Sequence, residues 1–262
     1  MVAAPVPTDL LLLVAVVVVA GAVNGVAGFG FALVGTAALA AVVDRPATAV
    51  VVMIVPILAV NLSLVRELSA AELRRCARRF GPLVGAALVG TLAGLVVLDR
   101  LPAGPLRIGL GLLSLGFVAT RQRAVALPGR SAVERRCFAE STPAMVGVGL
   151  VSGLLFGGTN VGVQLIAYLR SRGLAHATFV GVVAMVFLGL NGIRIGAAGA
   201  LGLYPSVGLA VASFVAVVPA VAGVAVGKRL RTIVDERERR MVVLVLLAVI
   251  GLRLVLGGLG IA

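Results

Sequence analysis

Long stretches with almost no charge dominate this sequence and restrict what it can fold into. The clearest are Leu10 to Ala20, Val50 to Val60, Val207 to Val226 and Met241 to Leu256. Because hydrocarbon cannot hydrogen-bond a peptide group, such stretches must satisfy their own backbone as helices inside a membrane. A membrane-spanning helix needs about 20 mostly apolar residues, and the chain offers about eight candidates. We therefore predict an all-α polytopic membrane protein.

Composition leaves no room for a separate soluble domain. Hydrophobic residues make up 61% of the chain and the mean hydropathy is +1.17, whereas apolar residues are nearer half in soluble domains. The first apolar stretch lacks the basic start of a signal peptide, since Asp9 is the only charged side chain before Asp44. We expect this stretch to belong to the mature fold.

The net charge of +13 would suggest nucleic acid binding in a soluble protein. Here the cations cluster in connecting loops, and the chain has only 9 Phe, 2 Tyr and no Trp to stack on bases. The pattern instead indicates membrane topology, because cationic loops stay in the cytoplasm. Cys76 and Cys137 lie in such basic segments, which favours reduced thiols over a disulfide.

The chain contains an internal repeat. The segment Gly21 to Gly30 is similar to Gly149 to Gly158, an offset of 128 residues, and Asn61 and Asn191 follow in corresponding places. We expect an N-terminal repeat at 1–120, a basic cytoplasmic linker at 121–140 and a C-terminal repeat at 141–262.

Loop charges predict how these repeats cross the membrane. If eight plain helices crossed it, two of the three large arginine clusters would fall on opposite faces, against the positive-inside rule. Re-entrant helical hairpins at about 9–43 and 141–170 remove this conflict and place the N-terminus outside. Each hairpin is then followed by three crossings, which we expect at 47–65, 80–98 and 104–120, then at 176–199, 204–227 and 241–258. An odd number of crossings makes the repeats inverted, as in many secondary transporters. Eight plain crossings are the alternative.

The two glycine segments are the first candidate site. Glycines spaced four apart in membrane helices often serve close packing, which is one interpretation of these segments. The other is that glycines and small polar residues break each helix and expose backbone N–H groups, which attract anions at a half-helix N-terminus. The candidate substrate-binding residues are Asn24, Gly25, Gly28, Gly30, Ser152, Gly153, Gly157, Gly158, Thr159 and Asn160.

Three further polar residues fall within predicted crossings. Asn61 and Asn191 could hold neighbouring helices together or face a ligand as an equivalent pair. Arg194 follows one turn after Asn191, and an arginine in hydrocarbon is costly unless it snorkels or faces water. We keep snorkelling and attraction of an anion as its two interpretations.

The absence of acidic residues from the predicted crossings favours an anion over a cation. All ten Asp and Glu lie at segment ends or in loops. The sequence shows no P-loop, metal-ligand cluster or cofactor motif, so we expect no cofactor, no metal and no enzymatic activity. Ser152 and His176 could suggest an intramembrane serine protease, but the spacing around Ser152 differs from the usual Gly-x-Ser-Gly.

At the two glycine segments, Gly21 to Gly30 and Gly149 to Asn160, the chain resembles the TauE/SafE family of sulfite exporters. The resemblance implies export of sulfite or an organosulfonate such as sulfoacetate through the bacterial inner membrane. The chain departs from the fuller family pattern, because Gly-Phe-Gly-Phe replaces a glycine triplet and the proline that often follows is missing. We expect a small anion and the lipid bilayer as partners, with homodimerisation left open. A membrane accessory protein without transport activity is the rival function.

Overall fold

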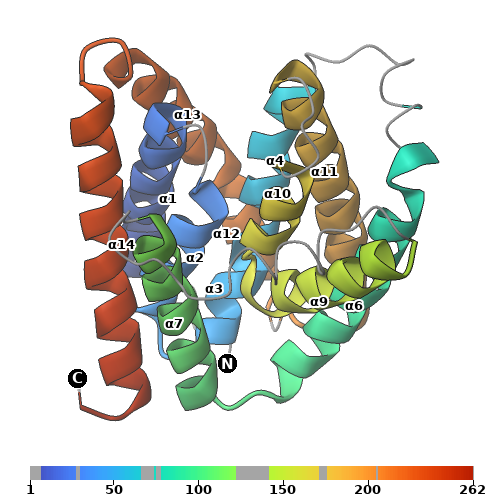
Figure 1. The fold of residues 1–262 in the computed structure, drawn as a ribbon. Helices are drawn as coiled ribbons and strands as arrows, with labels where there is room; N and C mark the ends of the chain where they lie inside the picture. The colour runs from blue at the N-terminus through green and yellow to red at the C-terminus, as the bar shows by residue number, and fades with distance from the viewer. Residues whose placement is uncertain are drawn as a thin grey trace. The chain divides into compact units, whose positions relative to one another are not determined.

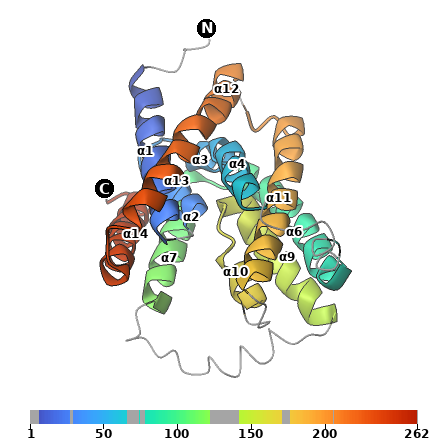
Figure 2. The same ribbon diagram turned by 90° about the horizontal axis from the view of Figure 1, so that it is seen from above.

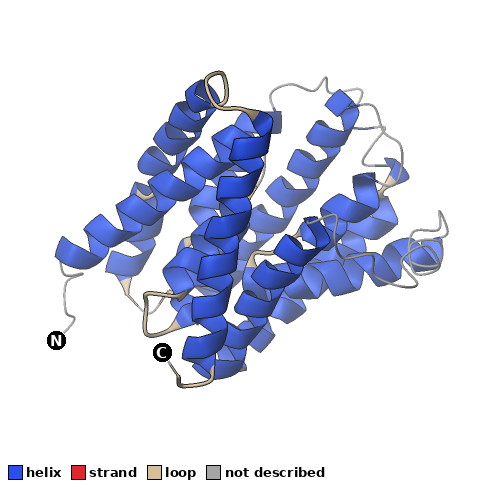
Figure 3. Ribbon diagram, turned by 60° about the vertical axis from the view of Figure 1, so that its left-hand side comes forward, coloured by secondary structure: helices blue, strands red, loops and turns tan. Residues whose placement is uncertain are grey.

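The computed structural model describes residues 7–27, 30–65, 74, 78–121, 142–170, 176–204 and 206–261. All regular secondary structure in these ranges is helical (Figure 3), which confirms the predicted all-α class. The helices, labelled in Figure 1, are α1 (Pro7–Ala27), α2 (Phe31–Ala40), α3 (Pro46–Val52), α4 (Ile54–Val65), α6 (Gly81–Arg100), α7 (Ala103–Arg121), α9 (Thr142–Thr159), α10 (Val163–Arg170), α11 (His176–Ala200), α12 (Val207–Val215), α13 (Val217–Leu230) and α14 (Glu236–Gly258).

The observed helices match the predicted segments within a few residues. In the first half, α3 with α4, then α6 and α7, occupy the three predicted crossings. In the second half these places are taken by α11, by α12 with α13, and by α14. Five helical stretches in the described residues are long and apolar enough to span a membrane: Leu10–Ala27, Gly81–Arg100, Thr142–Thr159, Val207–Leu230 and Arg237–Gly258. The chain is a polytopic membrane protein.

Each half begins with a broken helical hairpin. The first consists of α1 and α2, and the second of α9 and α10. α2 folds back along α1, since a Cβ added at Gly30 would lie 3.8 Å from Val23 and one at Gly35 would lie 3.3 Å from Ala20. The second arms have 10 and 8 residues, too few to span a membrane. That each hairpin enters and leaves by one face of the membrane stays a prediction.

The described residues group into two compact units that do not follow chain order. Unit 1 draws on Met1–Val60, Asp99–Arg123 and Gly202–Ala262, and unit 2 on Asn61–Leu98 and Ala124–Leu201. In unit 1, α7 and α14 run antiparallel. A Cβ at Gly104 would face the carbonyl of Gly258, and one at Gly111 would face that of Gly251.

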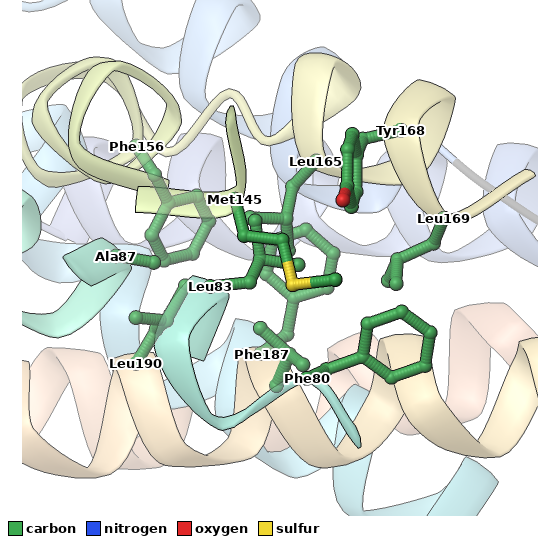
Figure 4. Packing of buried hydrophobic residues seen from close by; sticks show 11 residues of the cluster. Phe80, Leu83, Ala87, Met145, Phe156, Leu165, Tyr168, Leu169, Phe187 and Leu190 are labelled. Carbon is green, nitrogen blue, oxygen red and sulfur yellow. The ribbon is translucent and has the colours of Figure 1, made fainter. Parts of the chain in front are cut away.

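The core of unit 2 is built where four elements meet. It contains Phe80, Leu83 and Ala87 at α6, Met145 and Phe156 of α9, Leu165, Tyr168 and Leu169 of α10, and Val186, Phe187 and Leu190 of α11 (Figure 4). Phe156 and Phe187 contact each other with ring centroids 5.0 Å apart. This apolar cluster fixes the second hairpin against α6 and α11.

Candidate functional site

Glycines hold α1 against α13 inside unit 1, where the two helices lie side by side (Figure 2). A Cβ at Gly21 would lie 2.5 Å from the carbonyl oxygen of Ala220, and one at Gly25 would collide with that of Val224. On the other helix, a Cβ at Gly227 would collide with the carbonyl of Ala22. Because no side chain fits, Gly21 and Gly25 serve close helix packing.

The same arrangement recurs between α6 and α9 inside unit 2. A Cβ at Gly153 would collide with the carbonyl of Ala87, and one at Gly157 would collide with that of Thr91. In return, a Cβ at Gly94 would collide with the carbonyl of Leu154. Gly153 and Gly157 therefore have the packing role that Gly21 and Gly25 have in the first hairpin.

These contacts change the register of the repeat by one helical turn. Gly21 corresponds to Gly153 and Gly25 to Gly157, an offset of 132 (153 minus 21), where sequence similarity gave 128. The helix ends agree with the new offset: α1 ends at Ala27 and α9 at Thr159, and α2 begins at Phe31 and α10 at Val163. The sequence alignment of Gly30 with Gly158 is therefore wrong, and Gly30 corresponds to Gly162.

Each hairpin break contains a residue with a positive φ. Gly30, the N-cap of α2, has a φ of 101°, which favours glycine. In the second break Asn160 has a φ of 61°, a left-handed conformation that asparagine tolerates better than most residues. Gly158, in contrast, lies inside α9. Gly28, another candidate, lies outside the described residues.

Hydrogen bonds of the Thr159 side chain and of the backbone close the second break. The Thr159 hydroxyl donates to the carbonyl of Leu155 and accepts from the backbone N–H of Val161. The backbone N–H of Asn160 donates to the carbonyl of Phe156 at 2.9 Å. These bonds end α9 sharply, so Thr159 acts locally to shape the turn.

Arg194 lies in the interior beside this break. Its side chain is 0% exposed, so it does not snorkel. One terminal nitrogen donates to the carbonyl of Gly157 at 3.0 Å, and the other donates to Oδ1 of Asn191 at 3.3 Å. Asn191 in turn donates from its amide nitrogen to the carbonyl of Phe187 at 2.8 Å. The structure thus brings three predicted site residues, Gly157, Asn191 and Arg194, into one hydrogen-bonded group.

Aromatic rings complete the surroundings of this guanidinium. The Arg194 Cζ lies 4.9 Å from the centroid of the Phe156 ring, a cation–π distance. A Cβ at Gly162 would collide with the ring of Phe187. Neither Phe156, Phe187 nor Gly162 was a candidate from sequence. Nothing in the local sequence marks the contact between Gly162 and Phe187. Aligning the two halves with an offset of 132 residues would have paired Gly162 with the candidate Gly30.

The other candidate residues are spread over both units. Ser152 is buried on α9, while Asn24 on α1 and Asn61 on α4 are half-buried. Asn24, Gly25 and Gly30 belong to unit 1, and Asn61 and the second-half candidates belong to unit 2. In the first break, Arg239 of α14 reaches the end of α1, where it donates to the carbonyl of Val26 at 3.4 Å.

Chemically, the group around Arg194 offers hydrogen-bond donors of the kind that suit an anion. α9, α10 and α11 contain no Asp or Glu, and a buried guanidinium offers planar donors that fit oxyanions. No group of three or more His, Cys, Asp or Glu that could hold a metal occurs among the described residues.

One comparison with known proteins gives a match. The family model described as "Sulfite exporter TauE/SafE" matches residues 13–254. Neither the curated proteins nor the solved structures contain a match.

Proposed function

Because the chain belongs to the TauE/SafE family of sulfite exporters, we propose that it exports a small anion, most simply sulfite or an organosulfonate such as sulfoacetate. The family consists of membrane transporters, and at that level the chain is a transporter and not an enzyme. Substrate, direction and placement in a bacterial inner membrane are parts of the proposal.

Arg194 carries this proposal. Its positive charge lies in the interior. The helices α9, α10 and α11 contain no Asp or Glu that could neutralise it. Buried charges are expensive in a membrane protein, and they commonly mark a substrate pathway. A sulfite or sulfonate group has three oxygens on one sulfur, which suit the fork of guanidinium N–H donors.

The surroundings of Arg194 suggest how an anion would be held. Its acceptors include a backbone carbonyl and a neutral amide, and an anionic oxygen would add the attraction between opposite charges to the hydrogen bond. An arriving anion therefore competes well for these donors. α10 begins at Val163, three residues after Asn160, and its N-terminal dipole favours negative charge at the same break.

Helix directions support the proposed topology. If eight plain helices crossed the membrane, α7 and α14 would be the fourth and eighth crossings and would run in the same direction. With two re-entrant hairpins they are the third and sixth, and run in opposite directions. The antiparallel packing of Gly104 against Gly258 and Gly111 against Gly251 favours inverted repeats. The placement of the N-terminus in the periplasm rests on the loop charges.

A flux assay tests the substrate proposal. Purified protein in proteoliposomes is screened with sulfite, sulfate, thiosulfate and sulfoacetate, with flux normalised to monodisperse protein. We expect Arg194→Gln to abolish flux and Arg194→Lys to retain a small part, because lysine keeps the charge and loses the fork. Arg253→Gln removes a charge at an exposed position of α14 and serves as the control. Normal flux in folded Arg194→Gln protein would refute the site.

A further inference from the structure

The turn between α13 and α14 combines positive charge with exposed apolar side chains. Of two stretches that can span a membrane, Val207–Leu230 ends at this turn and Arg237–Gly258 begins after it. Residues 231–236 therefore lie at the membrane surface. Phospholipid headgroups occupy that level of a bilayer.

Charge is concentrated at this end of the two helices. Between residues 228 and 240 the sequence has six cations and three acidic residues. The described side chains of Lys228, Arg229, Arg231 and Arg237 are exposed. At the opposite ends of the same helices, residues 201–206 and 257–262 carry no charge. The turn therefore presents an excess of positive charge to the headgroup layer.

Apolar residues are interleaved with these cations. Ile233 at the turn is 79% exposed, and Leu230 and Met241 beside it are also exposed. Membrane orientation requires only the cations, whereas exposed aliphatic side chains among cations are typical of segments that dip below the headgroups. A ligand with a negative phosphate and acyl chains matches both features. We propose that the α13–α14 turn is a binding site for anionic phospholipid.

This site is connected to the first hairpin break. Arg239, in the first turn of α14, donates to the carbonyl of Val26 in the last turn of α1. The backbone nitrogen of Lys228 lies 2.7 Å from where a Cβ at Gly25 would be. The turn thus lies against the end of α1, and a headgroup bound there would be close to this helix end.

Lipid binding to the purified full-length protein tests the proposal. Protein in neutral detergent is titrated with phosphatidylglycerol, and bound lipid is counted by native mass spectrometry. The variant Arg229→Gln/Arg231→Gln removes two exposed cations of the turn. Arg45→Gln/Arg100→Gln removes two exposed cations elsewhere in unit 1, and is the matched control. Each cation near a membrane surface changes affinity about fivefold, so we expect roughly 10- to 30-fold weaker binding in the first variant alone.

Two further titrations identify the ligand. Phosphatidylcholine should bind far more weakly than phosphatidylglycerol, and inorganic phosphate should not displace the lipid at equal concentration. Equal lipid binding by both double variants would overturn the proposal, as would equal binding of phosphatidylcholine or displacement by inorganic phosphate. None of these measurements depends on transport, so the lipid site can fail while the anion transport proposal stands, and the reverse.

Discussion

Arg194 on α11 donates a hydrogen bond to the carbonyl oxygen of Gly157 on α9 at 3.0 Å. Gly157 is also one of the glycines through which α9 packs closely on α6, because a Cβ there would collide with the carbonyl of Thr91. One glycine therefore links a helix-packing contact with the buried charge.

Neutralising this charge from a neighbouring position should stop transport without unfolding the protein. Asn191→Asp places a carboxylate where an amide oxygen now accepts from Arg194 at 3.3 Å. The two groups should form a buried ion pair that competes with any incoming anion. We expect normal yield and helicity with at least tenfold lower flux. Thr142→Asp, at the exposed start of α9, adds the same charge outside the candidate site and is the comparison variant. Flux retained by Asn191→Asp would argue against an anion at Arg194.

Packing glycines should be sensitive to a single methyl group. Gly153→Ala and Gly157→Ala force backbone atoms of α6 and α9 apart, and overpacking of this kind costs about 1–3 kcal/mol. We expect a lower melting temperature, measured by circular dichroism at 222 nm because the chain has no Trp. Gly147→Ala is the control on the same helix, since no atom lies within 4 Å of its Cβ position. Alanine is the better helix former, so Gly147→Ala should not lower the melting temperature. A drop of equal size in Gly147→Ala would therefore argue against close approach as the cause.

The helices could be predicted from sequence because uncharged apolar stretches leave the backbone one solution in a membrane. The repeat register could not. Glycines four residues apart align almost as well when shifted by one turn. The helix ends, together with the contacts of Gly227 with Ala22 and of Gly94 with Leu154, decide between the shifts. The choice of Gly30 and Gly158 as equivalents failed for this reason.

Arg194 shows a second limit of sequence reasoning. Its cost in hydrocarbon identified it as a candidate, and the pairing with Asn191 follows from helical spacing. Its contacts with Gly157 and Phe156 join two helices across 37 or more residues of chain. No local pattern encodes which carbonyl or ring an arginine will meet, so the choice between snorkelling and burial required the fold.

Labelling of introduced cysteines should report the orientation of unit 1. Arg107, near the start of α7, donates to the carbonyls of Val43 and Asp44 at 3.0 and 2.9 Å, so the loop before α3 and the start of α7 lie together. We expect Val42→Cys and Ala103→Cys to react with a membrane-impermeant thiol reagent added outside intact cells. Cys76 and Cys137, which lie outside the described residues, should be protected. Outside labelling of Cys137 together with protection at Val42→Cys would invert the proposed topology.

The contact between Gly162 and Phe187 should show whether the second break has to stay closely packed. Gly162→Ala brings a methyl group into the Phe187 ring, and this ring also packs on Phe156 beneath Arg194. We expect destabilisation of about 1–3 kcal/mol and loss of flux, because a shifted Phe187 ring should disturb its contact with Phe156.

Replacing the Phe187 ring with a smaller side chain should offset the effect of the methyl group added at Gly162. Phe187→Leu leaves space for a methyl group at Gly162, although it loses packing of its own. The double variant Gly162→Ala/Phe187→Leu should therefore be destabilised by less than the sum of the two single variants. We expect a coupling energy of about 0.5–3 kcal/mol. Thermal melts of the two single variants and the double variant give this coupling energy. Purely additive effects would mean that the methyl group is accommodated by movement of α10 and not by the ring, and the site around Arg194 would then tolerate changes at the break.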